Sequence, residues 1–145
     1  MTRAVVDTNI FLSAVIKPLG TVAPIIVRVE EGRFILVYSQ FMLDELIEKL
    51  ELPRIRRKYQ LDGAAIEKLL TLIIRLGERA EPDRQVNVCR DPDDNHVIEI
   101  ALAGNADFVV SGDDDLLVLE RFENVRFVPV REFLSILEQS NPSVE

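Results

Sequence analysis

Two apolar runs of this chain are each followed by a carboxylate. Asp7 comes directly after Ala4-Val5-Val6, and Asp113 comes three residues after Phe108-Val109-Val110. A short β-branched run of this kind is typical of a strand buried on both faces of a parallel sheet. Open α/β sheets bind ligands beyond the carboxyl ends of their strands, and a half-buried acid there is costly unless a cation stabilises it. The two acids therefore indicate one shared cation site.

Glu45 is a third candidate, on a helix predicted to follow Ser39. It lies at the edge of the apolar stripe of that helix, with Asp44 and Glu48 close by. The pattern alone does not single out Glu45 among these three acids. A solvated acid on the flank of a helix is the simpler interpretation of each.

The acid-rich segments 91–94 and 113–115 hold further candidates. Asp94 lies three residues before Val97, which places it at the top of the apolar face of a predicted helix. Mutual repulsion makes such clusters unfavourable unless a cation or a helix N-terminus offsets it. Helix capping explains much of the cluster at 91–94. It explains one acid of the cluster at 113–115, but not all three. Asp7-Thr8-Asn9 also suits a helix N-cap.

The candidate ligands are carboxylates with no cluster of histidine or cysteine beside them. Such a set favours hard divalent ions, Mg²⁺ or Mn²⁺, over zinc. Ions held by a few carboxylates commonly serve phosphoryl chemistry, in which they activate water and stabilise the attacking and leaving oxygens. His96 is expected at the surface of a helix, and Cys89 is expected to be a small buried residue rather than a nucleophile.

Strand-like and helix-like segments alternate along the chain, which indicates a parallel sheet flanked by helices. Strands are predicted at residues 3–6, 34–38, 107–110 and 125–128, with a further short strand at 86–88. Helices are predicted at residues 9–16, 21–31, 39–50, 62–74, 114–121 and 131–137, and from the turn at 91–94 through residue 102. Leu52-Pro53 is predicted to break the third of these helices.

The composition fits one domain with its own core. The chain has 145 residues, 48% of them hydrophobic, and we expect a single domain over residues 1–138 and a flexible tail at 139–145. One cysteine, no signal-peptide pattern and no apolar run of membrane-spanning length favour the cytoplasm. The formal net charge of −8 would discourage nucleic-acid binding, but acids gathered in a metal site inflate this count.

Four sequence blocks occur in a characteristic order. They are Val-Val-Asp-Thr-Asn-Ile-Phe-Leu-Ser, Met-Leu-Asp-Glu-Leu, Arg-Asp-Pro-Asp-Asp-Asn and Ile-Ala-Leu-Ala-Gly-Asn-Ala-Asp-Phe-Val-Val-Ser-Gly-Asp-Asp-Asp-Leu-Leu. Together they resemble the PIN domain family, in its branch of VapC-like toxin ribonucleases, over residues 3–135. The resemblance implies a three-layer α/β/α, Rossmann-like fold with a mostly parallel central sheet.

The resemblance also implies a nuclease site that binds Mg²⁺ or Mn²⁺. Its four core acids would be Asp7, Glu45, Asp94 and Asp113. Asp115 stands at a position that is often acidic in this branch, and whether Asp91 joins the site stays open. The polar residues that would brace the acids or a metal-bound water are Thr8, Asn9 and Ser111. Asn95 stands where many relatives carry an acid, and we assign it no metal role.

The implied activity is hydrolysis of RNA phosphodiester bonds by an endoribonuclease, leaving a 5′-phosphate and a 3′-hydroxyl. The implied role is the toxin of a type II toxin–antitoxin system, and the implied partners are RNA, a small antitoxin protein and a second copy in a homodimer. RNA approaching an acidic site needs cations. The densest basic run is Arg54, Arg56, Arg57 and Lys58. We predict that this run contacts phosphates; a solvated loop or helix face is the alternative.

Other classes of protein share some of these features. A phosphatase or phosphotransferase of the haloacid-dehalogenase type places a second acid two positions after the first, where this chain has Asn9. A receiver domain needs a buried lysine late in the chain, and no lysine follows Lys68. A PIN scaffold that acts mainly as a binding module is a third alternative.

Overall fold

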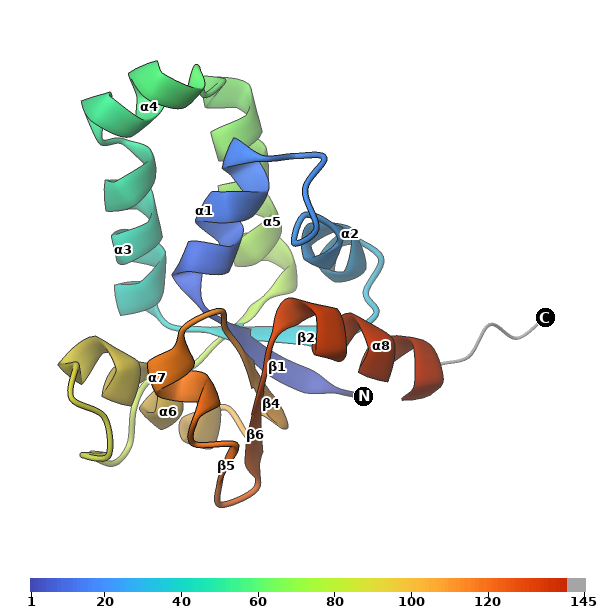
Figure 1. Ribbon diagram of the computed structural model, residues 1–145, viewed down its shortest axis with the longest axis vertical. Coiled ribbons are helices and arrows are strands. Elements are labelled where there is room, and N and C mark those ends of the chain that lie inside the picture. The colour runs from blue at the N-terminus through green and yellow to red at the C-terminus, as the bar shows by residue number, and fades with distance from the viewer. Residues whose placement is uncertain (141–145) are drawn as a thin grey trace.

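The computed structural model describes residues 1–140 and has a six-stranded sheet at its centre (Figure 1). The strands are β1 (Arg3–Val6), β2 (Ile35–Tyr38), β3 (Glu78–Arg79), β4 (Phe108–Val110), β5 (Arg121–Phe122) and β6 (Val125–Val128). They lie in the order β3-β2-β1-β4-β6-β5, and β5 alone runs antiparallel to its neighbour. The predicted mostly parallel sheet is confirmed.

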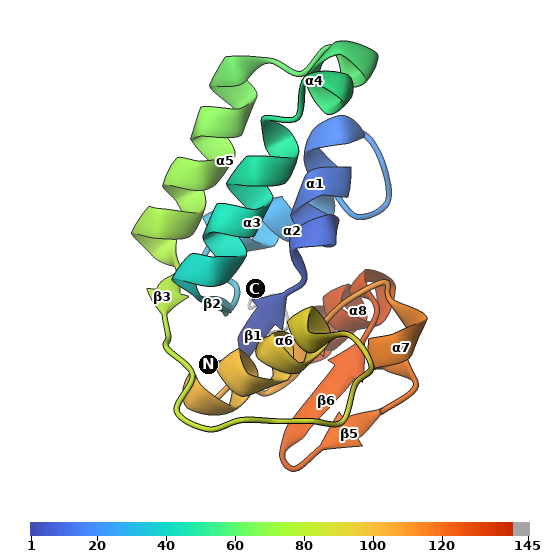
Figure 2. The ribbon, with the colours of Figure 1, turned by 90° about the vertical axis from the view of Figure 1, so that its left-hand side faces the viewer.

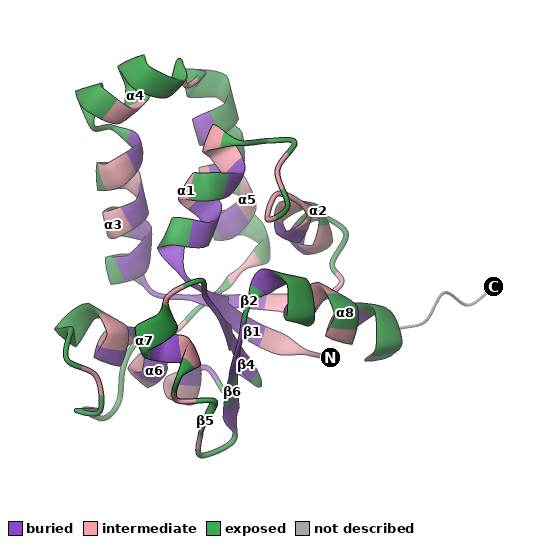
Figure 3. Cartoon of the chain, viewed as in Figure 1, coloured by how far each residue is buried: buried purple, intermediate pink, exposed green. Residues whose placement is uncertain are grey.

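Helices cover both faces of this sheet (Figures 1 and 2). They are α1 (Thr8–Ile16), α2 (Pro24–Glu30), α3 (Gln40–Leu50), α4 (Pro53–Tyr59), α5 (Gly63–Leu76), α6 (Pro92–Ala103), α7 (Asp114–Leu117) and α8 (Val130–Ser140). Ala4 and Val6 of β1 join a core with α1, α2, α3, α5 and α8, whereas Val5 packs with α6 and α7. The alternation of strand side chains thus builds three layers, and the central strands are buried between them (Figure 3).

The strand order reverses at β1. The chain continues from β1 to β2 on one side, while β4 pairs with β1 on the other side and places Val110 opposite Val6. The N–H of Asp7 donates to the carbonyl of Val110 at 2.9 Å, which extends this pairing one residue past β1. Such a reversal is where open α/β sheets form their ligand-binding crevice. The residues after β1 and β4 therefore meet at the edge of the sheet where such a crevice would form.

Side-chain caps begin two helices where the sequence predicts their starts. Ser39 Oγ accepts a hydrogen bond from the N–H of Met42 at 3.1 Å, and Asp62 Oδ1 accepts one from the N–H of Ala64 at 3.0 Å. Each cap satisfies an amide that the first turn of a helix leaves without a partner. The predicted break at Leu52-Pro53 is confirmed, because Pro53 begins α4.

Three predicted elements are shorter in the structure or absent from it. Residues 86–88 form no strand, because Val86 N–H donates to Glu99 Oε2 at 2.9 Å and Val88 N–H donates to Asn95 Oδ1 at 3.1 Å. The helix predicted at 114–121 ends at Leu117, and the chain then turns into β5. The helix predicted at 21–31 begins only at Pro24, after a turn at residues 21–23.

The last helix is longer than predicted. It was expected at residues 131–137, and α8 runs from Val130 to Ser140, so the first two residues of the predicted tail are helical. The rest of that tail, residues 141–145, lies outside the described residues. Within residues 1–140, no helix has the length and apolar character needed to cross a membrane.

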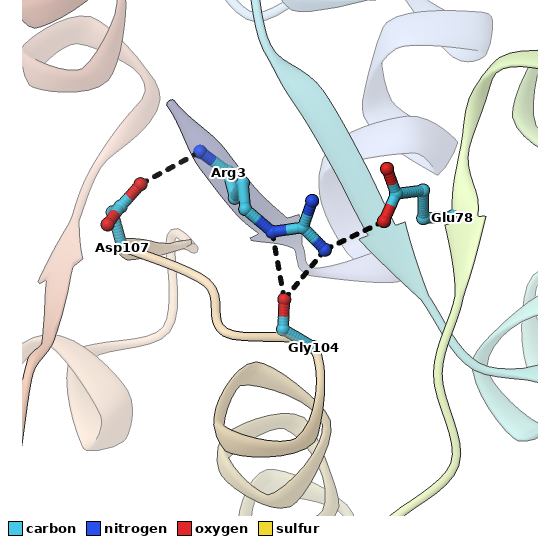
Figure 4. A network of polar contacts seen from close by, with 4 residues as sticks. All are labelled: Arg3, Glu78, Gly104 and Asp107. Atoms are coloured by element: carbon cyan, nitrogen blue, oxygen red, sulfur yellow. Dashed lines mark hydrogen bonds and ion pairs between the residues drawn. The ribbon is translucent and has the colours of Figure 1, made fainter. Parts of the chain in front are cut away.

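Arg3 anchors the amino end of β1 (Figure 4), and Asp7 follows the opposite end of the strand. Its guanidinium donates to the carbonyl of Gly104, at the C-terminus of α6, from Nε at 3.0 Å and from Nη2 at 2.8 Å. Nη2 also pairs with Glu78 Oε1 at 2.8 Å, and the backbone N–H donates to Asp107 Oδ2 at 3.0 Å. A cation is favourable at the C-terminus of a helix, where carbonyls lack intrahelical partners. The network joins β1 to α6 and β3.

Gly104→Ala is expected to destabilise the protein, because a Cβ there would meet the side chain of Val37 in β2. Gly104 has a φ of −91°, so packing rather than backbone strain sets the cost. Overpacking of this kind costs about 1–3 kcal/mol in the free energy of unfolding. Urea denaturation followed by circular dichroism measures the change.

Gly112→Ala is the matched control for this substitution. Nothing lies within 4 Å of a Cβ built at Gly112, and its φ is not positive. We expect the free energy of unfolding to stay within about 0.5 kcal/mol of the wild-type value. Equal losses at the two glycines would contradict the close approach of α6 to β2.

Candidate metal centre

The hydroxyl of Ser111 joins the ends of β1 and β4. Ser111 Oγ donates a hydrogen bond to Asp7 Oδ2 at 2.8 Å and accepts one from the N–H of Asp113 at 3.0 Å. Ser111 and Asp7 are both buried. Because the hydroxyl acts as donor and acceptor at once, it fixes the carboxylate of Asp7 relative to the segment that carries Asp113.

Asp94, Asp113 and Asp115 come together at this edge of the sheet. One carboxylate oxygen of each lies within 4.8 Å of those of the other two. Asp94 lies in the first turn of α6, and Asp113 caps α7 by accepting a hydrogen bond from the N–H of Asp115 at 2.9 Å. Asp115 also pairs with Arg90 at 3.2 Å, although the Arg90 side chain is 89% exposed. The structure thus gathers acids that are distant in the sequence.

The surroundings of Asp94 raise its pKa to about 6. Partial burial is the main cause, and the charges of Asp113, Asp91 and Asp7 add to it. A hydrogen bond between the carboxyls of Asp94 and Asp113 also favours the protonated form. This cluster therefore concentrates more negative charge than the neighbouring protein groups offset, which is a common property of functional sites.

Glu45 is connected to the edge of the sheet through Thr8. Thr8 Oγ1 donates to Glu45 Oε1 at 3.0 Å, and Thr8 directly follows Asp7. Glu45 is partly buried but lies outside the group of three close carboxylates. Asp44 is exposed and accepts a hydrogen bond from Gln40 Nε2 at 2.9 Å. Of these two adjacent acids, Glu45 is the one that contacts the segment after β1.

Asn9 contacts both the cap of α1 and helix α3. Its N–H donates to Asp7 Oδ1 at 3.3 Å, and its Oδ1 accepts a hydrogen bond from Lys49 Nζ at 2.9 Å. The first contact is the N-cap that the Asp-Thr-Asn sequence suits. Asp7 is therefore a helix cap as well as a candidate metal ligand, and its two carboxylate oxygens accept hydrogen bonds from Asn9 and Ser111.

Helix capping accounts for part of the clustered acids, as the sequence indicates. Asp91 is exposed and caps α6, since its Oδ1 accepts a hydrogen bond from the N–H of Asp93 at 2.9 Å. Asp91 does not belong to the group of three close carboxylates. Asp94 and Asp115 do belong to it and cap no helix. Capping therefore does not explain why these two acids lie beside Asp113.

Asn95 holds the segment that precedes α6. Its Oδ1 accepts hydrogen bonds from the N–H groups of Val88 at 3.1 Å and Cys89 at 2.8 Å, and its Nδ2 donates to the carbonyl of Cys89 at 3.2 Å. The side-chain amide of Asn95 is thus fully used in hydrogen bonds to the backbone.

Partial burial raises the pKa of the Cys89 thiol, and nearby acids, Asp94 foremost, raise it further. A protonated thiol is a poor nucleophile.

His96 is not the surface residue that we predicted. Its Nε2 lies 2.8 Å from Ser39 Oγ, and its ring packs edge-to-face against Phe41 with 4.7 Å between ring centroids. The side chain is half-buried, and this burial lowers its pKa although Glu99 and other acids act in the opposite direction. No sequence pattern predicts this contact, because Ser39 and His96 are 57 residues apart.

The basic run lies apart from the acids. Arg54, Arg56, Arg57 and Lys58 lie on α4, an exposed helix at the far end of α3 from the sheet (Figures 2 and 3). Within residues 1–140, none of the four pairs with a carboxylate. The structure therefore brings the predicted acids and bracing residues to one edge but leaves the basic residues on a separate surface.

The carboxylate cluster suits a divalent ion with oxygen ligands. Mg²⁺ binds oxygens at about 2.0–2.1 Å, so two of its ligands are at most about 4.2 Å apart. The oxygens of Asp94, Asp113 and Asp115 lie within 4.8 Å of one another, and a small side-chain movement would bring them to a common ion. The group contains no histidine nitrogen or cysteine sulfur, which disfavours zinc.

Comparisons with known proteins identify the family. A family model described as PIN domain matches residues 3–115. The chain is also 36% identical over 122 residues to the uncharacterized protein MJ1680 of Methanocaldococcus jannaschii. The aligned region covers 84% of this chain and 77% of the archaeal protein. The chain therefore belongs to the PIN domain family, a superfamily of metal-dependent nucleases. This confirms the family resemblance and the three-layer fold, while membership of the VapC-like branch stays a prediction.

Asp94→Asn is expected to raise the Tm of the metal-free protein at pH 7.5. The pKa of Asp94 is about 6 in the folded chain, against about 3.9 in an unfolded one. Between these values the folded state holds a proton that the unfolded state has released, so stability falls as the pH rises from about 4 to 6. The neutral amide removes this cost. We expect a gain of about 2–4 °C at pH 7.5 that vanishes near pH 4, measured by calorimetry in EDTA.

Glu67→Gln is the control for removing a negative charge. Glu67 is an exposed acid on α5, outside the cluster. Surface substitutions of this kind change the free energy of unfolding by about 0.5 kcal/mol or less. A lower Tm for Asp94→Asn than for wild type at pH 7.5 would show that the carboxylates do not repel one another in the folded state.

Proposed function

We propose that this protein is an endoribonuclease that depends on Mg²⁺ or Mn²⁺. The observation that carries the proposal is the close group of Asp94, Asp113 and Asp115 at the switch point of the sheet, in a chain of the PIN domain family. The group joins the starts of α6 and α7, and hydrogen bonds through Ser111 and Thr8 hold Asp7 and Glu45 at the same edge. Carboxylates this close repel one another, and a cation that they share is the best explanation for their position.

The residues take distinct roles in this proposal. Asp7, Asp94 and Asp113 would hold an ion, with Asp115 assisting, and Glu45 would position a second ion or the attacking water. When bound, the ion supplies Lewis-acid chemistry by lowering the pKa of water and stabilising the attacking and leaving oxygens. Ser111 and Thr8 hold Asp7 and Glu45 in place through the hydrogen bonds at 2.8 and 3.0 Å.

The proposed reaction needs no side-chain nucleophile. The oxygen of water bonds to phosphorus and the bond to the 3′ oxygen breaks, which leaves a 5′-phosphate and, after protonation, a 3′-hydroxyl. The proton of the attacking water passes to solvent. His96 lies against Ser39, and the Cys89 thiol has a raised pKa, so neither is suited to replace water as nucleophile. The carboxylate of Asp94 must lose its proton before it can hold an ion, since metal and proton compete for it.

Asp94→Asn and Asp113→Asn are each expected to lower RNA cleavage by about 100-fold or more, because each removes a charged ligand from the cluster. The measurement is cleavage of single-stranded and structured RNAs with Mg²⁺, Mn²⁺ or EDTA, resolved on denaturing gels. Asp114→Asn is the matched control, since Asp114 is an exposed neighbour of Asp113 outside the group of three. Its rate should equal that of wild type.

Four outcomes would count against the proposed function or against a part of it. Equal cleavage by wild type and both variants would reveal a contaminating nuclease. Calorimetric titration with Mg²⁺ or Mn²⁺ tests the metal site. Equal binding to wild type and to Asp7→Asn would remove Asp7 from the site. No binding to either protein would indicate a PIN scaffold that binds other molecules. Hydrolysis of a phosphomonoester in place of RNA would favour a phosphatase.

Removing two cations from α4 should weaken RNA binding and flatten its salt dependence. We propose that RNA runs along α3 from the acids to α4, whose basic residues pair with no carboxylate within residues 1–140. For Arg56→Gln with Arg57→Gln, the slope of log affinity against log salt should fall by about 1.4 for single-stranded RNA. Arg121→Gln, on β5, is the control. An unchanged slope would exclude α4 from the RNA-binding surface.

The toxin role and the protein partners form a further part of the proposal. Membership of the PIN family supports a small antitoxin and a homodimer, and an apolar groove between α1, α2 and α5 offers a surface for a partner helix. Induced expression of wild type should arrest growth, whereas the Asp113→Asn variant should not. Equal growth with both proteins would remove the toxin assignment, and a companion gene beside this one would support it.

A further inference from the structure

An exposed aromatic ring stands next to the acidic edge of the sheet. Phe41 lies in the first turn of α3 with 49% of its surface exposed, and it belongs to neither hydrophobic core. Phe41 and Glu45 are four residues apart on the same helix, so they lie on the same face of α3. A ring at this position therefore lies one helical turn from a residue of the proposed site.

A side chain of α6 holds the Phe41 ring in place. His96 packs edge-to-face against Phe41, with 4.7 Å between centroids and 61° between ring planes. The imidazole is in turn held at 2.8 Å from Ser39 Oγ, the atom that caps α3. His96 lies two residues after Asp94 on α6. The aromatic pair thus bridges the two helices that carry Glu45 and Asp94.

A cation lies beside the same turn of α3. Arg79 Nη1 donates a hydrogen bond to Gln40 Oε1 at 3.4 Å, and Gln40 directly precedes Phe41. The Arg79 side chain is mostly exposed, and its pairing with Glu81 at 3.4 Å joins two solvated groups. Exposed pairs of this kind are weak, so a phosphate can compete for the guanidinium. The turn therefore combines an aromatic face with a group that attracts phosphate.

We propose that Phe41, supported by His96, stacks against an unpaired base of the RNA next to the cleaved bond. This inference rests on the proposed function and narrows its substrate class to single-stranded segments or loops. Bases in single strands are free to stack on aromatic side chains, whereas bases in a duplex already stack on one another. Stacking tolerates any base, so the pair selects for strandedness more than for sequence.

Phe41 could instead serve only to cover His96, and the two roles predict different results. A cover needs apolar bulk, so Phe41→Leu would behave like wild type. A stacking surface needs a flat ring, so Phe41→Trp would keep activity and Phe41→Leu would lose as much as Phe41→Ala. Ile74→Ala is the matched control, because Ile74 is 53% exposed and its helix, α5, carries none of the acids of the proposed site.

The test measures kcat and KM for cleavage of a short single-stranded RNA and of the same strand in a perfect duplex. We expect Phe41→Ala and Phe41→Leu to raise KM for the single strand about tenfold, as loss of one stacked base requires, with kcat nearly unchanged. Phe41→Trp and Ile74→Ala should stay within about twofold of wild type. Single nucleotides of the strand are then replaced, one at a time, by a nucleotide that lacks its base. At one position this change should raise KM about tenfold for wild type and leave KM unchanged for Phe41→Ala.

The remaining outcomes separate this inference from the proposed function. Wild type that cleaves no RNA in the presence of metal would overturn the proposed function, and the stacking role with it. Wild type that cleaves RNA while Phe41→Leu keeps the wild-type KM would overturn stacking alone. Base removals that lower the activity of wild type and Phe41→Ala by equal factors at every position would do the same. Melting curves of each variant exclude unfolding as the cause.

Discussion

The pairing of β1 with β4 is the constraint on which the acidic edge depends. It places the carbonyl of Val110 against the N–H of Asp7, and it brings Ser111 within reach of the Asp7 carboxylate. One buried hydroxyl then links two segments that start helices on opposite faces of the sheet. Residues far apart in the chain become neighbours because parallel strands end together. A change in this register would separate the acids even if every helix still formed.

The carboxylates at this edge lie close together although they repel one another. Partial burial and three neighbouring acids raise the pKa of Asp94 to about 6, and among residues 1–140 the exposed Arg90 pairs with Asp115 alone. Strand pairing and helix caps keep these groups close, so part of the folding free energy is stored as crowded carboxylates. Crowded carboxylates with a raised pKa are common at functional sites, and this observation does not depend on any relative.

The sequence is informative wherever a local rule decides the structure. Runs such as Ala4-Val5-Val6 predict strands, and Ser39 and Asp62 predict helix starts, because period and capping act over a few residues. Long-range pairings escape such rules. Two of the three residues in segment 86–88 are β-branched, yet the segment binds side chains of α6, and His96 contacts Ser39 across 57 residues. Asp7, Asp94 and Asp113 were recognisable by type and position, whereas Glu45 and the bracing residues Thr8 and Ser111 were identified only through the family resemblance.

The amide of Asn95 links the loop before α6 to the helix turn that carries Asp94. It binds the backbone of Val88 and Cys89, and Arg90 follows directly. The acid and the exposed cation that faces Asp115 therefore belong to one mechanical unit. Val86, two residues before Val88, is fixed to the same helix by Glu99, so the loop is attached to α6 at two points. A change in the length of the chain between these points and α6 would therefore move the cation away from Asp115.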